Sequence, residues 1–218
     1  MAYPTVSAPY GLQPINLIGG QQFAGQTREI AITAANPTIN YNTPIYNGDV
    51  VQIGSNGTVI ISTLAAQTSP VAGVLGVFVG CSYTNPTTKQ KVYSQYWPGF
   101  ASGVTDALAY IVDDPDALFK VVVCGSVADG SGLVPVPVTQ AYIGGNLALV
   151  LNTGNATTGD SKLAATSPGD PSASAALRIV DLIPETGYVN NSNVLVYPEV
   201  VVKFNFGYHS YYNATGVA

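Results

Sequence analysis

The side chains with the greatest potential for chemistry are a single histidine and two cysteines. His209 lies in a tyrosine-rich segment, whereas Cys81 and Cys124 lie in apolar runs. Catalysis at neutral pH needs a titratable group beside a nucleophile, and apolar surroundings raise the pKa of a thiol and disfavour the reactive thiolate. The sequence therefore predicts no catalytic residue and no enzyme. We expect His209 at the surface or in an interface, and both cysteines as buried free thiols.

No cofactor-binding residue or metal ligand is predicted. Two distant cysteines and one histidine do not give the spacing of a zinc site, and the glycines of residues 73–80 lack the Lys-Ser/Thr and the helix of a phosphate loop. Asp113, Asp114 and Asp116 supply hard oxygen atoms on a proline-set turn, but they lack the glycine and the distal glutamate of a known calcium loop. We expect a solvated turn there, with a calcium ion shared at an interface as the alternative.

Charge is scarce throughout the chain. Only 9% of the 218 residues are charged and the net charge is −5, whereas an ordinary soluble domain has about a quarter of its residues charged. Such an uncharged surface is suited to lying against other protein. The few basic residues are scattered, so we expect no nucleic-acid partner. Apolar runs are too short to span a bilayer and no signal peptide is evident, so we expect no membrane partner and synthesis in a cytosol.

Residues 1–25 predict an extended N-terminal arm in front of a β-rich body at residues 26–218. Three prolines precede residue 15, and the apolar side chains lack helical spacing. These apolar groups must be buried elsewhere, either on a partner protein or a neighbouring subunit or, as a strap, on the chain's own body. The candidate contact residues are Tyr3, Val6, Tyr10, Leu12, Ile15, Leu17 and Ile18.

The body shows the pattern of β-strands joined by short turns. Residues 50–53 and 58–61 flank an Asn-Gly turn, which is the strongest hairpin signal in the chain. Residues 71–83 and 91–97 flank a polar turn and are expected to pair antiparallel. The Tyr-Trp-Pro sequence at residues 96–98 is expected in the core, because Trp and Tyr bring large apolar areas, with an interface anchor as the alternative.

Two further features complete the predicted fold. Residues 107–112 and 118–123 flank the Asp-rich turn and are expected to pair with each other. Residues 152–175 are rich in Gly, Ser and Ala and predict a long loop. Short strands at nearly regular spacing, with little helical periodicity, predict an all-β fold with a β-barrel or β-sandwich body.

Three segments have a distinctive sequence. The first is APYGLQP at residues 8–14. The second is GVFVGCSYT at residues 76–84, followed by YWP at residues 96–98. The third is ALAYIVDDPD at residues 107–116, followed by Phe119. In this order and spacing the segments resemble a family of tailed-phage head proteins known as decoration or structural cement proteins.

The resemblance implies a non-enzymatic, β-rich virion protein, often a homotrimer, that binds the major capsid protein on the outside of the bacteriophage head and stabilises the capsid. Its expected location is the virion exterior, after synthesis in the host cytoplasm. The resemblance covers about residues 8 to 120, so the role of residues 125–218 depends on composition alone.

Two alternative functions remain open. A phage tail or fibre component would be expected to show repeats or a coiled-coil heptad pattern, and neither is visible. A carbohydrate-binding β-sandwich would use surface aromatic side chains, for which Tyr208, Tyr211 and Tyr212 are the candidates.

Overall fold

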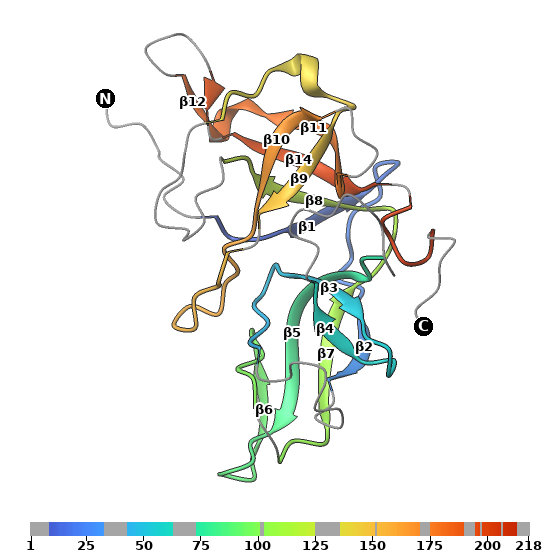
Figure 1. Cartoon of the computed structure of the whole chain (residues 1–218), viewed down its shortest axis with the longest axis vertical. Helices are drawn as coiled ribbons and strands as arrows, with labels where there is room; N and C mark the ends of the chain where they lie inside the picture. Colours follow the sequence, from blue (N-terminus) through green and yellow to red (C-terminus); the bar gives the residue numbers. More distant parts are fainter. Residues whose placement is uncertain are drawn as a thin grey trace.

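Two antiparallel β-sheets packed together form the protein, one above the other along the long axis of Figure 1. The computed structural model describes residues 9–32, 43–62, 73–100, 103–124, 136–150, 152–170, 175–189, 195–196, 198–205 and 207–212. Within these residues the only helical segments are two 3-10 turns, η1 (Gln140–Tyr142) and η2 (Pro184–Thr186). The predicted all-β fold is therefore confirmed.

The first sheet curls so that the end of β8, near one edge, meets β10 at the other edge. Its strands, in spatial order, are β1 (Gln13–Leu17), β8 (Ala117–Val122), β14 (Glu199–Phe204), β11 (Leu177–Ile183), β9 (Asn146–Val150) and β10 (Ala164–Asp170). Directly after β8, Val123 forms a bridge with Ala165 of β10, and the Cys124 N–H donates to the Ala165 carbonyl at 2.9 Å. A small separate ribbon pairs β12 (Tyr188–Val189) with β13 (Leu195–Val196).

The second sheet is built from one continuous stretch of chain, inserted between β1 and β8. Its strands, in spatial order, are β2 (Arg28–Ile32), β7 (Ala107–Val112), β5 (Gly76–Thr84), β3 (Val50–Ile53) and β4 (Val59–Ile61), with β6 (Lys91–Ser94) pairing with β5. Both predicted antiparallel pairs, β3 with β4 and β5 with β6, are confirmed. The β3–β4 turn works because Gly57 adopts a positive φ of 77° and the Asn56 side chain accepts the Thr58 N–H.

The predicted pairing of residues 107–112 with residues 118–123 is wrong. The intervening turn does form, since Asp114 Oδ1 accepts the Asp116 N–H at 2.8 Å. It is a crossover between the sheets, however, because β7 lies between β2 and β5 whereas β8 lies between β1 and β14. Both strands are largely buried along their length, so each can occupy the middle of a sheet.

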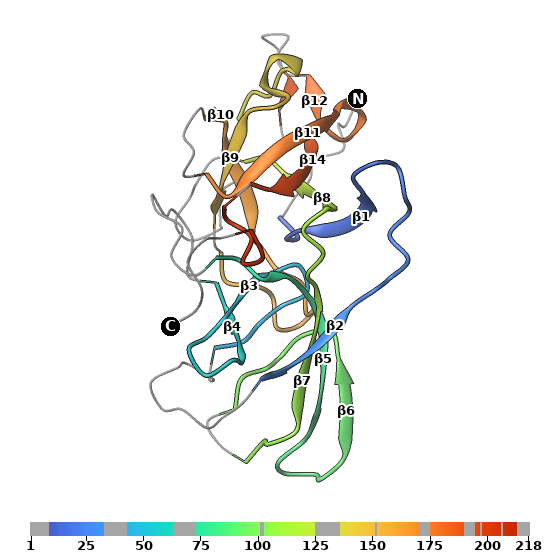
Figure 2. The ribbon, with the colours of Figure 1, turned by 90° about the vertical axis from the view of Figure 1, so that its right-hand side faces the viewer.

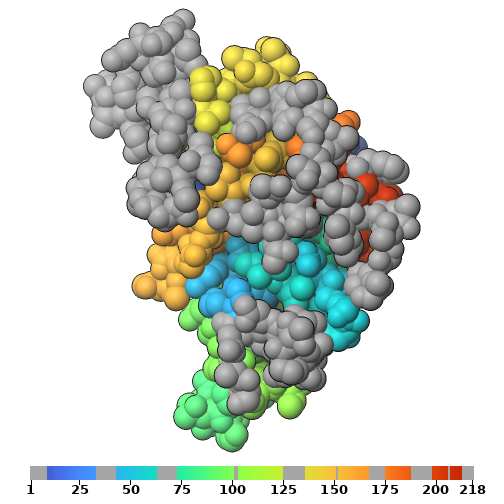
Figure 3. All heavy atoms as spheres, in the orientation of Figure 1, coloured from blue at the N-terminus to red at the C-terminus, as the bar shows by residue number. Residues whose placement is uncertain are grey.

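The predicted loop at residues 152–175 is only partly a loop. Strand β10 occupies its second half and pairs antiparallel with β9. The first half reaches the second sheet, where Asn47 donates its N–H to the Gly159 carbonyl at 3.0 Å and accepts the Ser161 N–H at 2.9 Å. The space-filling view shows this segment, in orange, directly against the blue atoms that precede β3 (Figure 3).

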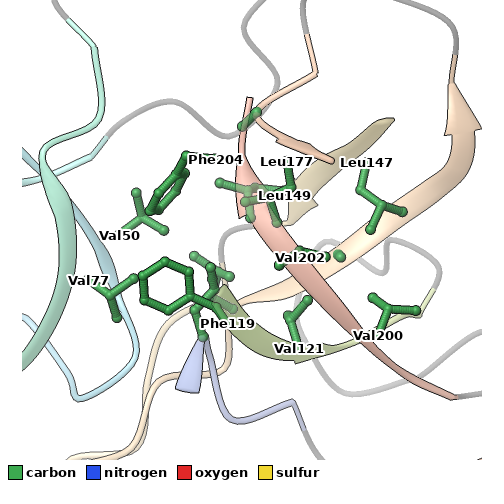
Figure 4. Packing of buried hydrophobic residues seen from close by; sticks show 14 of the residues in the cluster. Val50, Val77, Phe119, Val121, Leu147, Leu149, Leu177, Val200, Val202 and Phe204 are labelled. Atoms are coloured by element: carbon green, nitrogen blue, oxygen red, sulfur yellow. The ribbon is translucent and has the colours of Figure 1, made fainter. Parts of the chain in front are cut away.

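One apolar core joins the two sheets (Figure 4). Phe119 and Phe204 of the first sheet contact each other edge to face, with ring centroids 5.4 Å apart. Val50 and Val77 of the second sheet belong to the same buried cluster and lie opposite these rings. Because burial of apolar surface is the main stabilising contribution to folding, this cluster holds the sheets together.

A second apolar core lies within the second sheet. Trp97 is buried there, with the rings of Tyr83 and Phe100 at 5.2 and 5.3 Å from its own. The core position predicted for the Tyr-Trp-Pro block is confirmed for Trp97. Its neighbour Tyr96 is half-buried and stacks on Tyr46 at 5.6 Å.

Replacing Phe119 with alanine should destabilise the whole chain by about 3–5 kcal/mol, since a fully buried phenylalanine would leave a cavity between the sheets. Urea unfolding followed by circular dichroism measures the loss. Tyr93→Ala is the control, because Tyr93 is 76% exposed and its loss should cost no more than about 0.5 kcal/mol. An unchanged unfolding midpoint for Phe119→Ala would contradict the shared core.

Candidate interaction surface

The described part of the N-terminal segment lies along the chain's own first sheet. Strand β1 pairs antiparallel with β8, from Gln13 opposite Lys120 to Leu17 opposite Ala117. The chain then folds back on itself, since the Leu17 N–H donates to the Gln21 carbonyl at 2.8 Å. This part of the predicted arm therefore forms a strap on the body, the alternative that the sequence left open.

The seven candidate contact residues separate into different environments. Tyr3 and Val6 lie outside the described residues. Leu12 is fully buried in the core shared by the sheets, so it is a core residue of this chain and is unavailable to a capsid or a second subunit. Tyr10, Ile15 and Leu17 are half-buried. Ile18 is 46% exposed.

A close backbone contact fixes the strap, and it explains the glycine of the APYGLQP segment. Gly11 has φ +82°, and a Cβ at this position would lie 2.5 Å from the Gly48 carbonyl oxygen. The Gly11 N–H donates to the Leu163 carbonyl at 3.0 Å, and the Leu12 N–H donates to the Gly48 carbonyl at 2.9 Å. Only glycine combines this backbone conformation with this approach.

A buried polar cluster holds the strap at its start. The Tyr10 hydroxyl donates to Glu199 of β14, and the Lys120 ammonium lies 3.4 Å from the other oxygen of that carboxylate. Glu199 is only 7% exposed. Burial is the largest cause that raises the pKa of Tyr10 far above its usual value, followed by the hydrogen bond to Glu199 and its charge. The phenol therefore stays neutral and remains a donor.

A groove of about 590 Å³, which we call the junction groove, lies where the two sheets meet. One wall is the β1–β2 connection, which Figure 2 shows passing from the first sheet to the second, and the other is the crossover turn between β7 and β8. Both walls therefore join the sheets. The lining residues are Leu17, Gln21, Gln22, Phe23, Ala24, Gln26, Thr27, Arg28, Asp113, Asp114, Pro115 and Tyr211.

An ion pair with a tyrosine connects the walls of the junction groove. Arg28 Nη1 lies 3.1 Å from Asp113 Oδ2, and the Tyr211 hydroxyl donates to the same oxygen at 2.5 Å. The guanidinium carbon of Arg28 lies 5.7 Å from the centre of the Tyr211 ring. Burial, followed by the hydrogen bond and charge of Asp113, raises the pKa of Tyr211 to about 12, so its hydroxyl is a donor at neutral pH.

The three aspartates of the crossover turn are engaged separately. Asp113 pairs with Arg28, Asp114 caps the turn, and Asp116 pairs with Lys203 at 2.8 Å. They do not converge on a common point as calcium ligands would. Across the part of the chain that the structure describes, no group of three or more His, Cys, Asp or Glu side chains could hold a metal ion.

His209 is buried, so its predicted surface position is wrong. It is 1% exposed, and its Nδ1 accepts the Tyr211 N–H at 3.3 Å. Burial is the largest influence on its pKa and lowers it, although the charge of Asp113 opposes this. The backbone on both sides of His209 is bonded to Val74, since the Val74 N–H donates to the Tyr208 carbonyl and the Ser210 N–H donates to the Val74 carbonyl. These two hydrogen bonds hold the imidazole ring inside the protein. No local sequence signal indicated this position.

The tyrosines of the same segment also differ from one another. Tyr208 is 2% exposed, which removes it from the candidate sugar-stacking residues. Tyr211 and Tyr212 remain substantially exposed, and of these Tyr211 lines the junction groove.

The predicted free thiols are confirmed, since Cys81 and Cys124 are both buried and unpaired with each other. Burial raises the pKa of Cys81 to about 12 and that of Cys124 to about 11, so both are protonated at neutral pH. A protonated, buried thiol is a poor nucleophile.

The buried Ser161 hydroxyl also lacks the imidazole partner that a catalytic serine would need. The Ser161 hydroxyl donates to Asp49 Oδ1 at 2.5 Å, and Asp49 Oδ2 accepts the Tyr46 N–H at 2.8 Å. Burial raises the pKa of Asp49, while these two hydrogen bonds oppose the rise. The serine is thus bonded directly to the carboxylate, with no imidazole between them to act as a base.

Comparison with known proteins identifies no relative of this fold and groove. No protein-family model, curated protein or solved structure matches the chain. Among the described residues, none of the helical segments has the length and apolarity needed to cross a membrane.

Replacing Tyr10 with phenylalanine should lower the free energy of unfolding by about 1–3 kcal/mol, because Oε1 of the buried Glu199 carboxylate would lose the hydroxyl that donates to it. Urea unfolding at pH 7 measures the change. Tyr93→Phe removes an equivalent hydroxyl from an exposed ring and should have no measurable effect. Equal stability of the two variants would show that the Tyr10 hydroxyl does not stabilise the strap.

Proposed function

We propose that the chain is a virion structural protein, a cement or decoration protein that binds the outer surface of a tailed-phage capsid and stabilises the head. The observation that carries this proposal is that the three family-like segments meet in one place. Leu12, Val77 and Val112, one from each segment, belong to the core cluster that joins the sheets, together with Phe119. Because residues of all three segments share one core, the segments belong to one structural unit of this chain, which supports treating them as a single family-like pattern.

The character of the surface also supports a structural role. Charged residues are only 9% of the chain, so covering its surface with another protein carries a small desolvation cost. Exposed apolar side chains are available beside both sheets, with Ile18 directly after β1 of the first sheet and Tyr93 on β6 of the second. Since the described part of the strap packs on its own body, we propose that the capsid-binding surface includes the body.

We further propose that the protein is not an enzyme and has no cofactor. The support is chemical: the histidine is buried, both thiols are protonated at neutral pH, and the Ser161 hydroxyl is hydrogen-bonded to a carboxylate with no imidazole between them. The scarcity of basic residues supports the proposal that nucleic acid is not a partner. The proposed partners are the major capsid protein and further copies of this chain.

Copy number in purified virions tests the role directly. A cement protein should approach the major capsid protein in abundance, because it covers a repeated lattice. A tail or fibre component should be present in far fewer copies. Quantitative mass spectrometry of intact virions against labelled peptides measures the ratio, and a few copies for each particle would overturn the proposal.

Heads that lack the protein provide the functional half of this test. They should release their genome at a lower temperature than decorated heads, because a ligand that binds only the assembled shell stabilises that shell by mass action. Adding back purified protein should restore the release temperature. Unchanged release with and without the protein would argue against stabilisation.

The purified protein should be a homotrimer, the assembly implied by the family resemblance and suited to an uncharged surface. Several copies that bind together convert later contacts into intramolecular ones and raise avidity by a factor of about 100 or more. Native mass spectrometry at micromolar concentration measures the assembly. A strictly monomeric species would count against preassembly of the trimer before it binds the capsid.

A further inference from the structure

The junction groove has walls that are held in place by hydrogen bonds from both sheets. The Ile18 N–H donates to the Asp116 carbonyl at 2.9 Å, which ties the β1–β2 connection to the crossover turn. The ion pair of Arg28 with Asp113 links the same two walls further along. A groove fixed in this way needs little rearrangement to accept a ligand, and its volume of about 590 Å³ lies in the range of small-molecule sites.

One wall offers a row of free polar groups. Gln21, Gln22, Gln26 and Thr27 are exposed, and their side chains form no hydrogen bond with any residue that the structure describes. Each amide supplies both donors and an acceptor. On the opposite wall only Oδ2 of Asp113 is engaged by the described residues, which leaves Oδ1 as an acceptor.

Apolar surface lies beside these polar groups. Leu17 and Phe23 are half-buried against the core and line the groove. The ring of Tyr211 is held in a fixed orientation by its bond to Asp113, yet the residue is 46% exposed. Sugar rings combine apolar C–H faces with hydroxyl groups that donate and accept, so they complement an oriented aromatic ring beside amide side chains.

Charge decides between classes of ligand. Arg28 is neutralised by Asp113, and Asp114 leaves the groove with a formal excess of one negative charge. Phosphate, sulfate and acidic sugars would meet this charge without a free cation among the lining residues that the structure describes. An extended peptide would need a free strand edge, but the outer edge of β1 is already paired with Gln21 and Gln22.

We propose that the junction groove binds a short neutral oligosaccharide. The amides of Gln21, Gln22 and Gln26 and the free oxygen of Asp113 bond to sugar hydroxyls, and the Tyr211 ring packs against a sugar face. This function goes beyond the proposed capsid role and does not depend on it, since it is a property of the isolated protein. On a virion exterior, such a groove would attach the particle to glycan-coated surfaces.

Titration of the purified full chain with cellotriose, maltotriose and chitotriose, followed by isothermal calorimetry and saturation-transfer NMR, tests this proposal. At least one trisaccharide should bind saturably at millimolar concentrations. Tyr211→Ala should weaken that binding about tenfold or more, and Gln26→Leu several-fold. The second variant guards against misfolding, because the Gln26 side chain makes no bond to a described residue.

Two matched controls lie outside the groove. Tyr93→Ala and Gln90→Leu change an exposed tyrosine and an exposed glutamine on or beside β6 and should bind like the unchanged chain. 3′-Sialyllactose should bind more weakly than lactose, because its carboxylate meets the negative groove. Absence of saturable binding by all three trisaccharides, or equal binding by groove variants and controls, would overturn the proposal. If the groove variants lose capsid binding and the unchanged chain binds no sugar, the groove is a protein contact and the sugar-binding proposal is also overturned.

Discussion

Contact between the apolar faces of two sheets is the interaction on which the rest of this structure depends. Val50 and Val77 of the second sheet close one side of the cluster that Phe119 and Phe204 build from the first. This contact sets the distance that the β1–β2 connection and the crossover turn must bridge. The junction groove between these two segments, and the ion pair across it, are therefore consequences of how the sheets meet.

Sequence reasoning succeeded where partners are close in the chain. The β3–β4 and β5–β6 hairpins were predictable because a turn and two β-rich runs define each of them locally. The pairing of β7 with β8 was wrong, because a turn has the same residues whether the chain returns to the same sheet or enters another. Strand β10 was missed because its small and polar residues are typical of a loop. It is a strand because it pairs with β9, which the sequence did not reveal.

Sequence reasoning was less successful for the candidate site, because its residues come from distant parts of the chain. Arg28, Asp113 and Tyr211 meet although they are far apart in the sequence, and no spacing rule connects them. The tyrosines around His209 suggested exposure, yet backbone pairing beside Val74 buries the imidazole. The glycine of the APYGLQP segment was the one local signal, since a glycine between large side chains indicates a special backbone conformation.

The order of the strands along the chain has a consequence for biosynthesis. All strands of the second sheet come from β2 to β7, so every strand that it needs has been made once residue 112 has left the ribosome. The first sheet has to wait, because β14 lies between β8 and β11, and because Tyr10 takes its partner from residue 199. Contacts of such long sequence separation form slowly. The Tyr10 end of the strap can therefore be secured only on a nearly complete polypeptide, although β1 can pair with β8 earlier. A nascent chain that stops early exposes an unfinished first sheet to chaperones and proteases.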